Sequence, residues 1–85
     1  MRFYIHILTD TERFRDREGQ ECTDLNEAQL EANLSARELI AQELQAGRPV
    51  PLGWKLHIAD DEDTILATVS FAALVFDNVP PASGD

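Results

Sequence analysis

The sequence is short of several residue types, and each shortage excludes a class of protein. Only one of the 85 residues is a cysteine, Cys22, so no internal disulfide can form and a disulfide-stapled secreted domain is excluded. Seven lysines and arginines face sixteen acids, and the net charge of −9 opposes binding to nucleic acid or anionic membranes. No apolar run approaches the roughly 18 residues of a membrane span. We therefore expect no leader or membrane anchor, and no nucleic acid or membrane among the partners.

The length and the apolar content together allow one small hydrophobic core. Of the 85 residues 44% are hydrophobic, which suffices for a single core and not for two. From residue 77 onward proline, glycine and polar residues predominate. We therefore expect one compact domain over residues 1–76 and a frayed tail over residues 77–85.

The N-terminal stretch alternates in the manner of a β-strand. Phe3, Ile5 and Ile7 share one face, and Tyr4, His6 and Leu8 share the other. After a polar turn, the stretches 13–15 and 20–22 are predicted to be extended, with the type I turn Asp16–Gly19 between them. Because these stretches are rich in charge, they are typical of the edge of a sheet.

The longest predicted element is a helix over residues 24–46. Asp24 occupies the N-cap position and Glu27 follows three residues later, as in a capping box. Gly47 and then Pro49 end the pattern, because glycine favours the residue after a helix and proline cannot continue one.

A second hairpin is predicted after this helix. Trp54, Leu56 and Ile58 alternate with polar residues, and Asp60–Asp63 makes the turn. The return strand turns Ile65, Ala67 and Val69 inward. The following stretch, residues 70–76, is predicted either as a short helix that Ser70 caps or as a continuation of the strand, and the helix is favoured.

These elements predict an α+β fold in which two β-hairpins flank one long helix, in the order ββαββ. A four-stranded, mostly antiparallel sheet would carry the helix on one face. Placing the helix residues at 100° intervals gives a core stripe of Leu25, Ala28, Ala32, Ala36, Leu39 and Ile40. The bulk of the core would come from Phe3, Phe14, Trp54 and Phe71.

Several of these segments together resemble a known family. The run 2–7 is similar to an opening RYFFHL, and residues 16–19 resemble a DEEG turn. Residues 24–39 resemble the family's helix, and residues 54–63 are similar to its WRIEVxDEDG hairpin. The family is number 6894 in the series of domains of unknown function, frequent in alphaproteobacteria. The chain departs from the family pattern at two places. At Leu34 the family more often has a polar residue, and at Asp63-Thr64 it often has a glycine. The resemblance implies a cytoplasmic bacterial protein and supplies no activity.

The residues that carry chemistry are few. His6 and His57 are both expected on the sheet face away from the helix, beside Tyr4, where they suggest a small-ligand or metal site if their strands are neighbours. The alternative is that both histidines bond locally or to water. The turn 60–63 lacks the ligand spacing of a calcium loop, and Cys22 is expected to be a small core residue. With no catalytic motif present, we expect a non-enzyme without a cofactor.

The outer side of the predicted helix carries a second apolar row. Leu30, Leu34, Ala41 and Leu44 fall outside the core stripe, with Arg37 among them. Two leucines per chain would support only a weak homodimer, and scattered surface leucines are ordinary. An acidic ridge beside the row suggests an alternative function, in which the protein imitates nucleic acid and occupies a basic partner. The ridge comprises Asp24, Glu27, Glu31, Glu38, Gln42 and Gln45.

The sequence therefore predicts a small, acidic interaction or regulatory module that binds an unknown protein partner or a second copy of itself. The alternative is a small-ligand or metal-binding domain that uses the open sheet face with Tyr4, His6 and His57.

Overall fold

The computed structural model describes residues 1–77 of the chain. Its elements are β1 (Arg2–Leu8), β2 (Arg13–Phe14), β3 (Gln20–Glu21), α1 (Leu25–Gln45), β4 (Lys55–Ala59), β5 (Ile65–Ser70) and α2 (Phe71–Asp77). Of the tail predicted over residues 77–85, Asp77 is the last residue of α2 and the rest lies outside the described residues. Neither helix among residues 1–77 is both long and apolar enough to cross a membrane.

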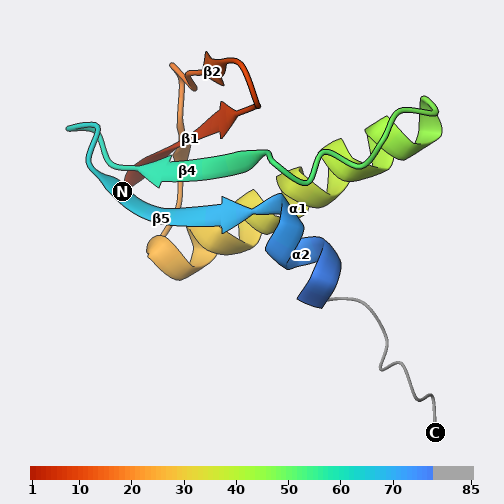
Figure 1. Cartoon of the computed structure of the whole chain (residues 1–85). Helices are drawn as coiled ribbons and strands as arrows, with labels where there is room; N and C mark the ends of the chain where they lie inside the picture. The colour runs from red at the N-terminus through yellow and green to blue at the C-terminus, as the bar shows by residue number, and fades with distance from the viewer. Residues whose placement is uncertain (78–85) are drawn as a thin grey trace, which may run out of the picture.

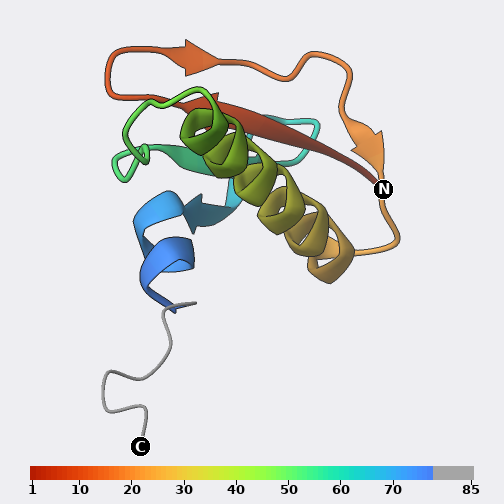
Figure 2. The same ribbon diagram turned by 90° about the vertical axis from the view of Figure 1, so that its right-hand side faces the viewer.

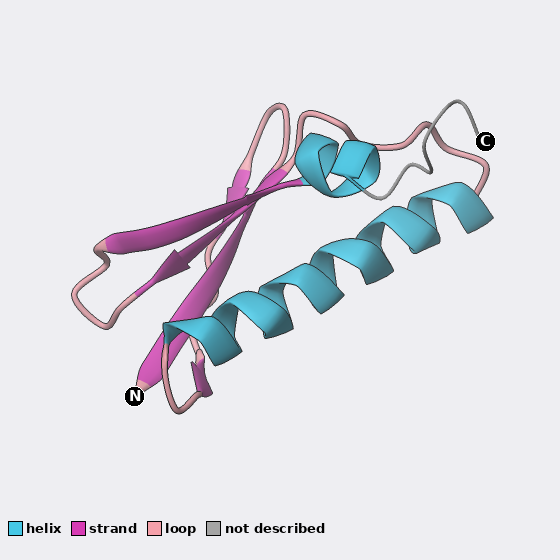
Figure 3. Cartoon of the chain, turned by 90° about the horizontal axis from the view of Figure 1, so that it is seen from below, coloured by secondary structure: helices cyan, strands magenta, loops and turns pink. Residues whose placement is uncertain are grey.

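The strands form one antiparallel sheet in the order β2-β1-β4-β5, and β3 also pairs with β1. Figure 1 shows β1, β4 and β5 side by side. In Figures 2 and 3, α1 lies across one face of this sheet. The predicted α+β architecture is confirmed. The charged stretch after β1 forms the predicted edge, although as two short pieces.

The core lies between the sheet and the alanines of α1. Ala28, Ala32 and Ala36 are fully buried against it, as the predicted stripe requires. Since alanine has the smallest apolar side chain, it lets the helix axis approach the strands. Phe3 and Phe71 supply most of the bulk, and the Trp54 ring packs 5.9 Å from the Phe71 ring.

Two residues predicted to face the core do not. Phe14 is 50% exposed, because β2 is only two residues long and lies at the sheet edge beyond the reach of α1. Ile65 is also exposed, because the register between β4 and β5 shifts at Ile58 and Ala59. Ala67 pairs with Ile58 while Ile65 pairs with Ala59, so Leu66 is an extra residue and the alternation breaks there.

The ends of both helices follow the predicted chemistry. The Asp24 carboxylate accepts a hydrogen bond from the Glu27 N–H at 2.9 Å, and the Glu27 side chain accepts one from the Thr23 N–H. At the other end Gly47 has a φ of 76°, and the Arg48 N–H donates to the Glu43 carbonyl, as in a Schellman motif. The Ser70 hydroxyl accepts from the Ala73 N–H at the start of α2, which confirms the second predicted cap.

Candidate functional site

His6 and His57 are directly opposite each other on the neighbouring strands β1 and β4. Because Phe3 and Leu56 on these strands are buried beneath α1, and side chains alternate along a strand, both histidines lie on the other face of the sheet. The strands of the two histidines are thus neighbours, and both residues lie on the expected face of the sheet. The face is not open at this point, however, since His6 is only 2% exposed.

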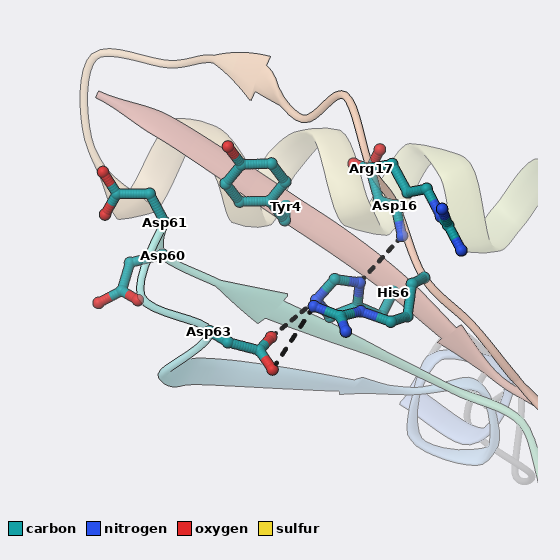
Figure 4. A pocket seen from close by; sticks show the side chains of 8 residues that line it. Tyr4, His6, Asp16, Arg17, Asp60, Asp61 and Asp63 are labelled. Atoms are coloured by element: carbon teal, nitrogen blue, oxygen red, sulfur yellow. Dashed lines mark hydrogen bonds and ion pairs between the residues drawn. The ribbon is translucent and has the colours of Figure 1, made fainter.

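His6 is covered by the loop between β2 and β3. Its Nδ1 accepts a hydrogen bond from the Asp16 N–H at 3.0 Å (Figure 4). Since an imidazole nitrogen that accepts carries no hydrogen, the neutral ring has its proton on Nε2. Asp63 Oδ1 lies 3.3 Å from Nε2, but the geometry is not that of a hydrogen bond, and no other described residue provides an acceptor. His6 thus presents a buried donor without a hydrogen-bond partner.

Asp16 fixes this loop against β1 at the gap between β2 and β3. Its carboxylate accepts the backbone N–H groups of Gly19, Ile5 and Glu18 at 3.0 to 3.2 Å. Burial by itself would raise the pKa of Asp16, but these three hydrogen bonds together, with His6 nearby, hold that pKa below its ordinary value. The carboxylate therefore stays ionised and is saturated with backbone donors.

Asp63 lies close to the side chains of one histidine and two arginines on this side of the sheet. It lies at the tip of the β4–β5 turn with a φ of 64°, a conformation that glycine favours and asparagine and aspartate tolerate. Besides His6, the Arg13 guanidinium lies 3.6 Å from its Oδ1 and the Arg15 guanidinium 3.8 Å from its Oδ2. Three potential donors thus converge on one half-exposed carboxylate, at distances longer than those of charge-assisted hydrogen bonds.

All of these groups except Arg13 border a cavity of about 400 Å³, which we call the His6 pocket. Its walls are charged or polar side chains from β1, the β2–β3 loop and the β4–β5 turn: Tyr4, His6, Arg15, Asp16, Arg17, Asp60, Asp61 and Asp63 (Figure 4). Of the three residues that the sequence suggested for a site here, the pocket brings together Tyr4 and His6 and leaves out His57. Among residues 1–77 no group of three or more histidine, cysteine, aspartate and glutamate side chains is arranged to hold a metal ion.

His57 has a different environment from its partner across the strands. Its Nδ1 is buried and has no hydrogen-bond partner among the described residues. Burial, followed by electrostatic effects of Arg13, His6 and Lys55, lowers the pKa of His57 below its ordinary value. Both causes disfavour the charged form of His57.

The second candidate surface lies on the outer side of α1. We call Leu30, Leu34, Ala41 and Leu44 the leucine row. Leu30, Leu34 and Leu44 are 64%, 53% and 57% exposed, and Ala41 is exposed as well. Their predicted position outside the core is therefore confirmed.

The leucine row borders a groove between α1 and the β3 segment. The groove has a volume of about 420 Å³ and is lined by two leucines, three acids and two further residues: Gln20, Glu21, Cys22, Glu27, Leu30, Glu31 and Leu34. The Cys22 side chain is buried in the core, as the sequence predicted. The groove thus combines two exposed leucines with three glutamates.

The comparisons with known proteins place the chain in a family. A family model described as a domain of unknown function, DUF6894, matches residues 2–72. The chain belongs to the DUF6894 family. No curated protein and no solved structure matches the chain. The match covers both candidate surfaces of the DUF6894 domain, and it confirms the resemblance seen in the sequence.

Sequence reasoning missed the residues that shape the His6 pocket of this DUF6894 domain. Asp16 was predicted only as the first residue of a turn, and the spacing Asp-x-x-Gly carries no sign that its carboxylate also holds Ile5 of β1. Arg13 and Arg15 were interpreted only as edge charges, and Asp63 only as part of a solvated turn. The alternation of Arg13 and Arg15 along one strand was the only available signal, because it places both on the same face as His6.

Proposed function

We propose that this DUF6894 domain is a small, non-enzymatic protein-interaction module that binds its partner through the outer face of α1. One observation carries the proposal: a helix that packs by alanines leaves three leucines more than half exposed along its opposite side. Leaving such a row in water costs free energy that a partner would recover. As part of the proposal we keep a cytoplasmic location, since a single free cysteine needs no oxidising compartment.

The spacing of this surface favours a helical partner. Leu30, Leu34, Arg37, Ala41 and Leu44 follow one another at intervals of four, three, four and three residues. This is the spacing of the seam by which two helices pack in a coiled coil. A second helix laid along α1 would therefore contact all of these positions at once.

The charges beside the row favour a basic partner. Glu31 and Glu38 are exposed on one flank of the row, and Glu27 and Glu31 line the groove beside it. Together with the net charge of −9, these acids attract a helix whose apolar face is bordered by lysine or arginine. The proposed occupant is thus a basic amphipathic helix of another protein.

A second copy of the chain fits this surface less well. Burying Leu30 and Leu34 of both chains at about 2 kcal/mol each gains roughly 8 kcal/mol, against an association cost of about 4–15 kcal/mol. Two chains that each carry a net charge of −9 also repel one another. Self-association through this row would therefore be weak.

A synthetic amphipathic helix with a leucine face bordered by lysines tests the proposal. Its binding to the full chain is measured by fluorescence anisotropy, and we expect Leu34→Ser to weaken it about tenfold. The matched control is Leu66→Ser, which removes an exposed leucine from β5 instead. A peptide with glutamates in place of the lysines should bind far more weakly.

Two results would contradict the proposal. One is an affinity that Leu34→Ser leaves unchanged, and the other is an equal loss in Leu34→Ser and Leu66→Ser. If the wild-type chain instead sediments as a dimer that Leu34→Ser dissociates, the occupant of the row is a second copy and the proposed basic partner is wrong.

A further inference from the structure

The positive side chains of an acidic protein are concentrated beside the His6 pocket. Arg13 and Arg15 lie close to the Asp63 carboxylate, as His6 does. Lys55 lies on β4, the strand next to β1. Burial lowers the pKa of His57, and Arg13, His6 and Lys55 lower it further, which agrees with their position on the same side of the sheet. These groups lie on the side of the sheet opposite to α1, so they are independent of the leucine row.

We propose that His6, Arg13 and Arg15 form a binding site for the oxyanion group of a small molecule, a phosphate or a carboxylate. Asp63 occupies this site when no ligand is bound. We call these three residues the oxyanion site.

The contacts of Asp63 support its role as an internal stand-in for a ligand. Its oxygens lie 3.3, 3.6 and 3.8 Å from the nearest nitrogens of His6, Arg13 and Arg15, whereas a charge-assisted hydrogen bond spans about 2.7–2.9 Å. The buried His6 Nε2 therefore keeps a proton that no described residue accepts in good geometry. A free oxyanion can move until it accepts hydrogen bonds from these donors. The Asp63 carboxylate is attached to the turn and does not reach them in this way.

The other acids near the site are already engaged or face elsewhere. The Asp16 carboxylate accepts three backbone N–H groups, and Asp60 Oδ1 accepts those of Glu62 and Thr64. Asp61 lines the opposite side of the pocket from His6 in Figure 4. Since these acids repel an anion, we expect binding of a bare phosphate to be weak, with a dissociation constant of about 1 mM or higher.

The pocket gives a ligand both access and room. Its volume of about 400 Å³ exceeds that of a phosphate group, and His6, Arg15 and Asp63 all line it. Asp63 is half-exposed at the tip of a turn, so rotation of its side chain toward solvent would clear the oxyanion site without moving a strand. Binding thus needs only a local exchange of one carboxylate for another oxyanion.

Removing the stand-in tests the proposal directly. Asp63→Asn keeps the shape of the side chain and tolerates the φ of 64°, while it removes the competing charge. We expect Asp63→Asn to bind inorganic phosphate at least about tenfold more tightly than the wild type, with shifts of the His6 side-chain resonances in NMR titrations. Acetate, titrated separately, tells a carboxylate ligand from a phosphate ligand.

The control variants separate the oxyanion site from general charge. Adding Arg15→Gln to Asp63→Asn should abolish the gain, whereas adding Arg48→Gln, which removes a charge at the end of α1 paired with Glu43, should leave it. Asp63→Gly, which also suits a positive φ, repeats the test if the asparagine variant folds poorly. The proposal is overturned if neither phosphate nor acetate binds the Asp63 variants more tightly, or if the gain survives Arg15→Gln.

Discussion

Asp16 shows how one side chain substitutes for a missing stretch of strand. β1 pairs with β3 at Arg2 and Phe3 and with β2 at Ile7 and Leu8, so the residues between have no strand on that edge. The Asp16 carboxylate accepts the Ile5 N–H in this gap, and its own N–H donates to His6. The same residue thereby completes the sheet edge and sets the tautomer of the buried histidine.

Asp16→Ala should therefore be among the most destabilising changes on the surface of this domain. It leaves three backbone N–H groups without their carboxylate, and we expect a loss of about 2–3 kcal/mol in the free energy of unfolding. Urea denaturation followed by circular dichroism measures the loss. Asp61→Ala, an exposed neighbour across the pocket, is the control and should change stability by less than about 0.5 kcal/mol. Equal effects of the two changes would contradict the role given to Asp16.

His57 gives the fold a specific dependence on pH. Its pKa in the folded chain lies below the ordinary value of 6.5, so below that pH the unfolded chain takes up a proton before the folded chain does. The free energy of unfolding should consequently fall as the pH drops from about 6.5 toward the folded pKa, and level off below it. Comparing wild type with His57→Gln at a series of pH values should show a smaller fall in the variant. Identical pH profiles would show that His57 does not titrate in this way.

At the scale of elements, α1 is a helix with two apolar faces. Its alanine face packs on the sheet, and its leucine row faces solvent. A helix with leucines on both sides would sit further from the strands, so the alanines determine the spacing of the two layers. The C-terminal part of α1, which runs from Leu25 to Gln45, extends beyond the strands, as Figure 1 shows.

A change in side-chain size should affect the stability of the domain strongly on the alanine face of α1 and only weakly on the leucine row. Ala32→Leu inserts a large side chain where no space exists, and we expect a loss of about 1–3 kcal/mol or more. Leu34→Ala, two residues away, removes an exposed side chain and should change stability by less than about 0.5 kcal/mol. Thermal unfolding of both variants measures the contrast. A larger loss in Leu34→Ala would place the leucines against the sheet and refute this packing.

The elements predicted from sequence were those with strong local signals. Asp24 and Gly47 mark both ends of α1, and Ser70 marks the start of α2 because a hydroxyl there can cap a helix. The alanine stripe followed from helical periodicity alone. The bulge that exposes Ile65 could not be predicted, since it depends on the register between β4 and β5. The His6 pocket was also beyond prediction, because it joins a strand, a loop and a turn that are far apart in the chain.

At the scale of the whole molecule, the two sides of the sheet carry different sets of charged side chains. Four glutamates and one arginine lie on α1. The opposite side carries His6, His57 and three basic residues, and also the four aspartates that line the His6 pocket. We propose a basic partner for the first side and an oxyanion ligand for the second. The two proposals concern opposite sides of the sheet, so each can fail without the other.

The central claim is that the leucine row is the docking surface. The most direct measurement is a titration of the methyl-labelled chain with the lysine-bordered helix, followed by NMR. We predict shifts at the methyl groups of Leu30, Leu34 and Leu44, and none at those of Leu8 and Leu66 on the strands. Shifts confined to Leu8 and Leu66, or no shift at saturating peptide, would contradict the claim.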